Sequence, residues 1–268
     1  MKTVVSIARL QGYLRHTGRK RYETIAVPSF TLFLHPTDDL TYFNYAIPDD
    51  PWADNLGHAL SMLREAFTAR GRHPRIEFIE AFAPQLGPAL RAAGFVEEAR
   101  QQLMVCTVET YQPAPPVSGL TVAELTGASA AGEVQAYLNV QRRGFDPRDE
   151  GRATADDAEH FLRTIGEGRA FVASLDGQPV GVGMFTAPFA GVTEIAGLTT
   201  LAPFRRRGIA TRLTALAARK AMTQGAQVVF LTAANERAGR VYERVGFVGR
   251  ATMLAYANPG GWGASPSP

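Results

Sequence analysis

Over the second half of the chain, hydrophobic positions follow the periods of alternating strands and helices. Two segments show helical periodicity, residues 128–142 and residues 154–166. Thr154 is suited to cap the second of these helices, with Asp157 three positions further on. The pair Asp176-Gly177 is typical of a hairpin turn. The strands predicted for this half are residues 120–124, 170–175, 179–186, 193–201 and 227–231. The pattern predicts an α/β domain with a sheet flanked by helices.

A glycine-containing turn follows the strand that ends at Leu201. It reads Arg205-Arg206-Arg207-Gly208-Ile209-Ala210-Thr211 and opens a helical pattern. The first amides of a helix lack intrahelical partners and face the positive end of its dipole, so such a turn favours a pyrophosphate. Gly208 would let the backbone approach the ligand closely. An ordinary solvated cap is the alternative, although arginines at a helix start oppose the dipole.

The pattern R-x-x-G-x-A resembles the acyl-CoA signature of the GNAT superfamily of N-acetyltransferases, usually written Q/R-x-x-G-x-G/A. Asn235, Ala238, Tyr242 and then Gly246-Phe247 follow in the order typical of that family. The resemblance covers residues 119–257. A Rossmann or P-loop site is excluded, because no G-x-G-x-x-G occurs and Gly208 is not followed by Lys-Ser/Thr.

The resemblance implies a mixed, mostly antiparallel sheet that binds acetyl-CoA where two parallel strands splay apart. The pantetheine arm would pair with backbone near residues 199–201, and the pyrophosphate would lie on the amides of residues 207–211. Asn235 would hydrogen-bond the pantetheine. The cofactor-binding residues implied in this way are Thr199, Thr200, Leu201, Arg205, Arg206, Arg207, Gly208, Ile209, Ala210, Thr211, Asn235 and Ala238.

The implied reaction is direct attack of a primary amine on the acetyl thioester in a ternary complex. An alkyl amine with a pKa of about 10.4 is mostly protonated at pH 7, which costs roughly 4–5 kcal/mol. Glu194 is the candidate base, and Tyr242 the candidate acid for the departing thiolate. A backbone amide near Thr199 or Leu201 would meet the oxyanion. Glu194 as a rim carboxylate and Tyr242 as a core aromatic are the alternatives.

The first half resembles a degenerate copy of the second. A strand at residues 76–79, a helix at 84–93, a Gly94-Phe95 turn and a strand at 104–108 repeat the later order. Aligning Gly94 with Gly246 puts Ala83 opposite Asn235 and Leu90 opposite Tyr242. Asp54, a good helix cap, falls opposite Arg205, and its charge would repel a pyrophosphate. These substitutions predict a tandem GNAT-like protein with a non-catalytic first domain; an unrelated α/β domain is the alternative.

The expected domains follow from length and local composition. The 268 residues suggest two domains. A proline-rich linker at 114–118 separates the degenerate domain, 1–113, from the catalytic domain, 119–258. Residues 259–268 are expected to be a flexible tail.

Charge and composition narrow the function further. A net charge of +3 is too small to imply nucleic acid, and the single cysteine, Cys106, excludes internal disulfides and cysteine-rich zinc sites. The five histidines lack metal-site spacing, so no metal is expected. The absence of a secretory segment and of a membrane span favours the cytoplasm. The sequence does not distinguish small-molecule amines, peptide N-termini and protein lysines as the acceptor. It does not determine the oligomeric state either. A non-catalytic acyl-CoA-binding regulatory protein is the competing function.

Overall fold

The computed structural model describes residues 5–36, 39–51 and 55–258. They divide into a C-terminal unit, residues 104–249, and an N-terminal unit, which comprises residues 5–103 and the chain from Arg250 onward. Strands β5 (Val96–Cys106) and β11 (Val248–Ala257) each pass from one unit into the other. The units therefore differ from the two predicted halves at these strands. The predicted tail, 259–268, and Asp54 lie outside the described residues.

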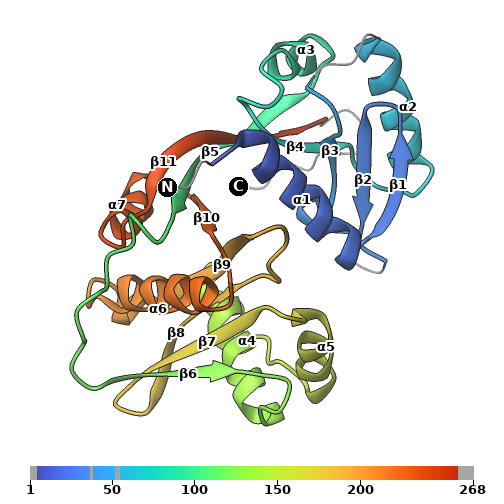
Figure 1. The fold of residues 1–268 in the computed structure, drawn as a ribbon. Coiled ribbons are helices and arrows are strands. Elements are labelled where there is room, and N and C mark those ends of the chain that lie inside the picture. The colour runs from blue at the N-terminus through green and yellow to red at the C-terminus, as the bar shows by residue number, and fades with distance from the viewer. Residues whose placement is uncertain (1–4, 37–38, 52–54, 259–268) are drawn as a thin grey trace. The chain divides into compact units, whose positions relative to one another are not determined.

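The C-terminal unit contains a mixed sheet with the order β10-β9-β8-β7-β6 (Figure 1). Pairing is antiparallel from β6 to β9 and parallel between β9 and β10. Asp176 and Gly177 join β7 to β8 with φ values of 50° and 84°, as a type I′ turn requires. The predicted hairpin and the mixed, mostly antiparallel sheet are confirmed. The strands are β6 (Leu120–Leu125), β7 (Arg169–Leu175), β8 (Gln178–Phe185), β9 (Val192–Thr200) and β10 (Val228–Ala233).

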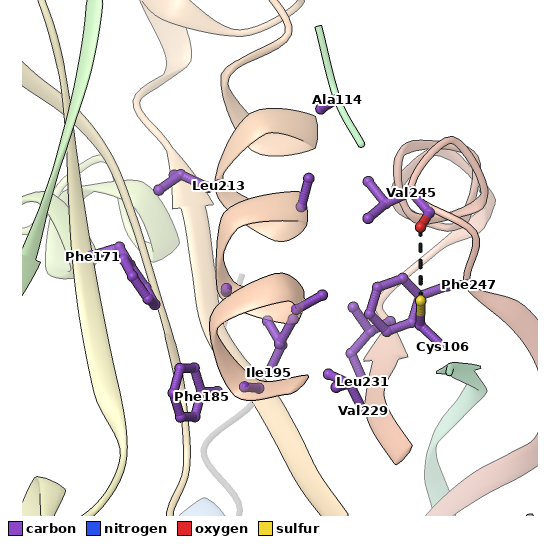
Figure 2. Close-up of a cluster of buried hydrophobic side chains, with 14 of the residues drawn as sticks. Cys106, Ala114, Phe171, Phe185, Ile195, Leu213, Val229, Leu231, Val245 and Phe247 are labelled. Carbon is purple, nitrogen blue, oxygen red and sulfur yellow. Dashed lines mark hydrogen bonds between the residues drawn. The ribbon is translucent and has the colours of Figure 1, made fainter. Parts of the chain in front are cut away.

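Helices cover both faces of this sheet. On one face, Tyr137 of α4 (Ala131–Phe145) packs with Val172 and Val182 of the strands, beside α5 (Ala155–Ile165). On the other face, α6 (Ile209–Thr223) packs on the strands, as Figure 2 shows around Leu213 and Ile195. The capping box predicted for Thr154 and Asp157 is present at α5. The last helix, α7 (Glu236–Glu243), follows β10.

After its first helix, the N-terminal unit repeats the order of elements of the C-terminal unit. Its strands follow the order β1-β2-β3-β4-β11, with β3 and β4 parallel and the other pairs antiparallel. The repeat therefore extends upstream of the segments that the sequence aligns, and the tandem fold is confirmed. The elements are α1 (Ile7–Arg21), β1 (Glu23–Val27), β2 (Phe30–Leu34), β3 (Asn44–Pro48), α2 (Leu56–Thr68), β4 (Arg75–Ile79) and α3 (Leu86–Ala92).

Two details of this unit correct the sequence-based expectation. The side chain of Asn55 caps α2 by accepting from the amide of His58, so Asn55 holds the capping role predicted for Asp54. Strand β5 begins at Val96, well before residue 104. Its first residues alternate between exposed and half-buried, so the apolar run marked only the fully buried end of the strand.

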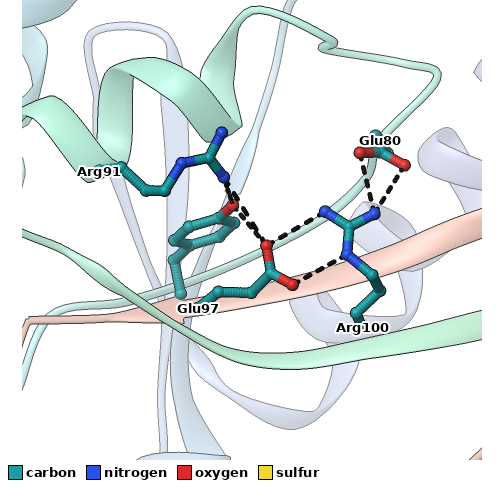
Figure 3. Close-up of polar contacts among 5 residues, drawn as sticks. Glu80, Arg91, Glu97 and Arg100 are labelled. Atoms are coloured by element: carbon teal, nitrogen blue, oxygen red, sulfur yellow. Dashed lines mark hydrogen bonds and ion pairs between the residues drawn. The ribbon is translucent and has the colours of Figure 1, made fainter.

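A polar network holds Tyr256 of β11 within the N-terminal unit (Figure 3). Its hydroxyl donates to Glu97 at 2.7 Å and accepts from Arg91 at 2.5 Å. Arg100 bridges Glu97 and Glu80. The hydrogen bond from Arg100 is the main reason that the pKa of Glu97 lies below its usual value. Because the charged side chains around the buried Tyr256 are partly exposed, their ion pairs fix geometry more than they add stability.

Candidate active site

Strands β9 and β10 pair and then part. Their parallel register runs from Val192↔Val228 to Glu194↔Phe230. Both strands continue beyond that point, β9 to Thr200 and β10 to Ala233. Backbone groups that leave a sheet need other partners, so the diverging ends offer hydrogen bonds to an extended ligand. The parallel pair predicted from the sequence is confirmed.

The part of β9 beyond Glu194, which no longer pairs with β10, contains a bulge. The register with β8 shifts between Val182 and Met184, and Gly197 opposite has a φ of 62°. Helix α4 lies directly on this bulge, because a Cβ at Gly197 would stand 2.5 Å from Nε2 of Gln141. A Cβ at Gly144 would likewise overlap the side chain of Thr199. The two glycines thus allow the close approach that fixes β9 where it leaves β10.

The turn at residues 205–208 fits an anion. A short 3-10 helix, η2 (Ala202–Phe204), leads into it, and both Arg206 (φ 65°) and Gly208 (φ 80°) are left-handed. Turns of this kind point successive amides into a concavity that binds anions. Among the described residues, no backbone hydrogen bond is made by the amides of residues 206–211, whereas Arg212 N donates to Gly208 O. The open amides and the helix dipole suit the predicted pyrophosphate.

The three arginines differ in what their side chains contact. Arg205 donates from Nε to the carbonyl of Thr200 at 3.0 Å and from a terminal nitrogen to that of Gly144 at 3.4 Å. Its guanidinium therefore ties the end of β9 to the C-terminal turn of α4, where a cation is favoured. Arg207 lies over the ring of Phe204, 5.6 Å from its centroid. Arg205 is a brace in this structure, a role that the sequence did not predict.

This brace leads to a testable difference between neighbouring arginines. Arg205→Gln is expected to weaken acetyl-CoA binding about tenfold, because the turn loses two charge-assisted hydrogen bonds that hold it in place. Arg206→Gln removes the same charge from a side chain that makes no hydrogen bond to the described residues, and should weaken binding only a few-fold. Calorimetric titration of both variants measures the difference. Equal losses in the two variants would show that charge, and not bracing, is what Arg205 supplies.

The segment that connects β5 to β6, which includes the proline-rich linker, lies along α6. The hydroxyl of Tyr111 donates to Ala215 O at 3.3 Å, and Arg212 donates to Ala114 O at 3.1 Å. A Cβ at Gly208 would stand 3.3 Å from Cγ2 of Val117. Residues 111–117, hereafter the strap, therefore follow α6 back to the turn that fits an anion.

Tyr242 lies on α7, half-buried against the core that contains α6. Its ring centroid is 6.3 Å from that of Phe247. Burial raises the pKa of its phenol above the ordinary value, and no charged group opposes this. Among the described residues, its hydroxyl makes no hydrogen bond. A buried, neutral phenol with no structural hydrogen bond is suited to donate a proton.

Asn235 is the N-cap of α7. Its amide oxygen accepts from the backbone of Ala238 at 3.0 Å, which leaves its NH₂ group as a donor. The two residues that the resemblance assigns to cofactor binding are thus also partners in a helix cap. Their contact with a pantetheine arm stays a prediction.

Glu194 is the last paired residue of β9 before the strands part. Its backbone is fixed by Thr186, whose amide and hydroxyl both donate to Glu194 O, at 2.9 and 3.2 Å. Ile195 packs toward α6 and Ala196 toward α4. Because side chains alternate along a strand, Glu194 belongs to the face that α4 and α5 cover.

The residues at the end of β9 are engaged differently from one another. The amide of Leu201 donates to Val180 O at 2.9 Å, so it is committed to the sheet and does not meet an oxyanion as the sequence had suggested. The hydroxyl of Thr200 is buried and has no partner among the described residues. A buried orphan hydroxyl beside the start of α6 is compatible with a polar ligand there.

No group of three His, Cys, Asp or Glu side chains among the described residues is arranged to hold a metal. None of their helices is both long and apolar enough to cross a membrane.

Comparison with known proteins matches residues 134–247 to the Acetyltransferase (GNAT) family. A GCN5-related N-acetyltransferase from Kribbella flavida shares the fold at 25% identity, with a TM-score of 0.79 over 97% of this chain and 98% of that one. A GCN5-related N-acetyltransferase from Sphaerobacter thermophilus shares the fold at 16% identity, with a TM-score of 0.62 over 86% of this chain and 80% of that one. A tandem GNAT protein from the clavulanic acid biosynthesis pathway shares it at 14% identity, with a TM-score of 0.63 over 86% of this chain and 78% of that one. No curated protein matches the chain. Residues 134–247 therefore match the Acetyltransferase (GNAT) family, in a chain with a tandem GNAT-like fold.

Proposed function

We propose that the protein is an acyl-CoA-dependent N-acyltransferase that moves the acetyl group of acetyl-CoA to a primary amine by direct attack in a ternary complex. The observation that carries this proposal is the joining of two features on one strand. Strand β9 parts from β10 at Glu194 and then leads, through η2, into the turn with the open amides. A ligand with an amide-containing arm and a pyrophosphate matches both features.

The proposed roles follow from the chemistry of each group. The amides of residues 207–211 would bind the pyrophosphate, and the free edge of β9 the pantetheine arm. Glu194 would take the proton that the acceptor must lose to become a nucleophile, directly or through a water. Tyr242 would return a proton to the departing sulfur. Burial keeps its phenol protonated well above pH 7, so the acid is ready in the resting protein.

The acceptor is proposed to be a small-molecule or peptide amine in the cytoplasm, with no part for nucleic acid. Charges in the segment from Arg142 to Gly151 are paired, since Arg148 contacts Asp146 within it at 3.2 Å and Arg142 contacts Asp157 of α5 at 3.6 Å. The segment therefore has no electrostatic potential of a single sign that would attract a polyanion or a polycation. Phe145 at the end of α4 is 65% exposed, so the segment does offer an apolar contact.

Gly208 provides the test of the donor. Gly208→Asp is expected to weaken acetyl-CoA binding at least about 100-fold in calorimetric titration, because it puts a carboxylate beside the proposed pyrophosphate. Gly208→Asn is the matched control. It has the same size, meets the same Val117 side chain and tolerates a positive φ equally well, but it is neutral.

The wild type should bind acetyl-CoA 1:1, and the asparagine variant should bind more tightly than the aspartate variant. Equal losses in both variants would mean that space or backbone strain, and not charge, governs the turn. A folded wild type that does not bind acetyl-CoA would remove the donor from the proposal.

A further inference from the structure

The N-terminal unit has its own pair of diverging parallel strands. Strands β3 and β4 pair at Ala46↔Ile76 alone among the described residues, and then run on to Pro48 and Ile79. Ile76 stands as far before Gly94 as Val228 stands before Gly246. Matching the two strand pairs on this basis puts Pro48 where the C-terminal unit has Glu194.

The side chain of Gln11, from α1, bridges these two strand ends. It is fully buried. Its Nε2 donates to the carbonyl of Pro48 at 3.5 Å, and its Oε1 accepts from the amide of Ile79 at 3.2 Å. One carboxamide thus takes up backbone groups of both strands after they part, groups that would otherwise be buried without partners.

Arg15, one turn further along α1, fixes the helix over the same place. Its guanidinium donates to the carbonyl of Asp49 at 2.8 Å and contacts the carboxylate of Asp49 at 3.2 Å. The hydroxyl of Thr31 donates to that carboxylate at 2.7 Å. Since Asp49 directly follows Pro48, Gln11 and Arg15 together hold α1 to the chain that leaves β3.

The corresponding helix of the C-terminal unit carries a similar sequence and makes different contacts. Leu10-Gln11-Gly12-Tyr13-Leu14 of α1 matches Val134-Gln135-Ala136-Tyr137-Leu138 of α4, and both tyrosines are fully buried. Helix α1 packs on β4 as well as on β1 and β2, whereas α4 packs on β7, β8 and β9. Gln135 is only half-buried. The glutamine that bridges the strands is therefore particular to the N-terminal unit.

We infer that Gln11 is a built-in substitute for an amide of the pantetheine arm and closes the N-terminal unit to acyl-CoA. A primary carboxamide offers the same donor and acceptor as a pantetheine amide, and here both are used by the strand ends. The protein then binds one acyl-CoA per chain, in the C-terminal unit. This inference concerns the N-terminal unit and does not depend on the proposed activity.

Hydrogen exchange at the Ile79 amide tests the inference in the full chain. Gln11→Leu keeps a side chain of similar volume and removes both hydrogen bonds. Hydrogen exchange at the Ile79 amide should therefore become at least about tenfold faster. Gln135→Leu, at the matching place in α4, should leave Ile79 unchanged. If Gln11→Leu does not fold, Gln11→Asn retains the amide on a side chain too short to reach both strands and should give the same acceleration.

Acetyl-CoA supplies the second readout. Added to the wild type, it should leave the exchange of Ile79 unchanged, and calorimetry of Gly208→Asp should show no residual site. Unchanged exchange at Ile79 in the Gln11 variants would overturn the bridging role. Protection of Ile79 by acetyl-CoA, or a second equivalent bound, would overturn the closure. A wild type that binds no acetyl-CoA would contradict the proposed function, while the exchange rates of the Gln11 variants would still decide the bridge.

Discussion

Replacing Tyr242 by phenylalanine is expected to lower kcat for acetyl transfer by about 10²–10³ and to leave acetyl-CoA binding within a few-fold of the wild type. The phenol is half-buried against the core, and its ring packs with Phe247. Phenylalanine keeps that packing and removes only the hydroxyl group, and with it the proton that would be donated. The loss should therefore fall on the chemical step, measured as amine-dependent CoA release, and calorimetry should show a nearly unchanged Kd.

Tyr111→Phe is the matched control for this variant. Tyr111 also packs on the core with α6, but its hydroxyl donates to Ala215 O within the strap. Its removal should cost about 1 kcal/mol of stability and little activity. Full turnover in Tyr242→Phe would remove the acid role from this residue. Acetyl-CoA binding by a wild type that transfers to no amine would instead support the non-catalytic acyl-CoA-binding alternative.

The pH dependence of the reaction follows from the same burial. Because desolvation raises the pKa of Tyr242, its protonated form persists beyond the ordinary value of about 10. A fall in kcat caused by loss of this proton should therefore begin only above that pH. A decline between pH 7 and 9 in the wild type would have to come from another group.

The sequence predicted those parts of the site whose signals are local. The sequence indicates Gly208 because close approach of the backbone to a ligand needs a residue without a Cβ, and the structure adds that its φ is 80°. The hairpin at Asp176-Gly177 and the cap at Thr154 belong to the same class. In each case the residues that make the contact are neighbours in the chain, so their spacing alone carries the information.

Contacts between distant segments could not be predicted in this way. Arg205 was assigned to the cofactor because it opens a known signature, yet its guanidinium reaches Gly144 on another helix. The prolines predict a linker at 114–118, but not the tertiary hydrogen bonds that hold the strap against α6. The bridge made by Gln11 depends on strands far along the chain from α1. Because these partners lie far away in the sequence, no pattern in the residues around Arg205, the strap or Gln11 indicates them.

Gly246→Ala is expected to destabilise the C-terminal unit by more than about 4 kcal/mol. Gly246 has a φ of 91°, a conformation that alanine adopts only with strain. Its backbone also lies against the chain that enters the strap, so that an added Cβ would overlap the carbonyl oxygen of Thr110. The neighbouring contacts are tight as well, since Gln112 N donates to Val245 O at 2.9 Å and Cys106 Sγ lies 3.7 Å from the same oxygen (Figure 2). Backbone on both sides leaves no side chain that could rotate away.

Gly94→Ala separates the two causes of that loss. Gly94 aligns with Gly246 and has a similar φ of 83°, but a Cβ there would have no heavy atom within 4 Å. It should therefore cost only the backbone strain, about 1–2 kcal/mol.

Urea denaturation followed by circular dichroism measures the free energy of unfolding of both variants. Similar losses at the two glycines would mean that the strap yields to an added methyl group, and the strap could not then hold α6 and its turn in place. A much larger loss at Gly246 would show that the strap packs rigidly within the C-terminal unit and is part of the scaffold of the proposed donor site.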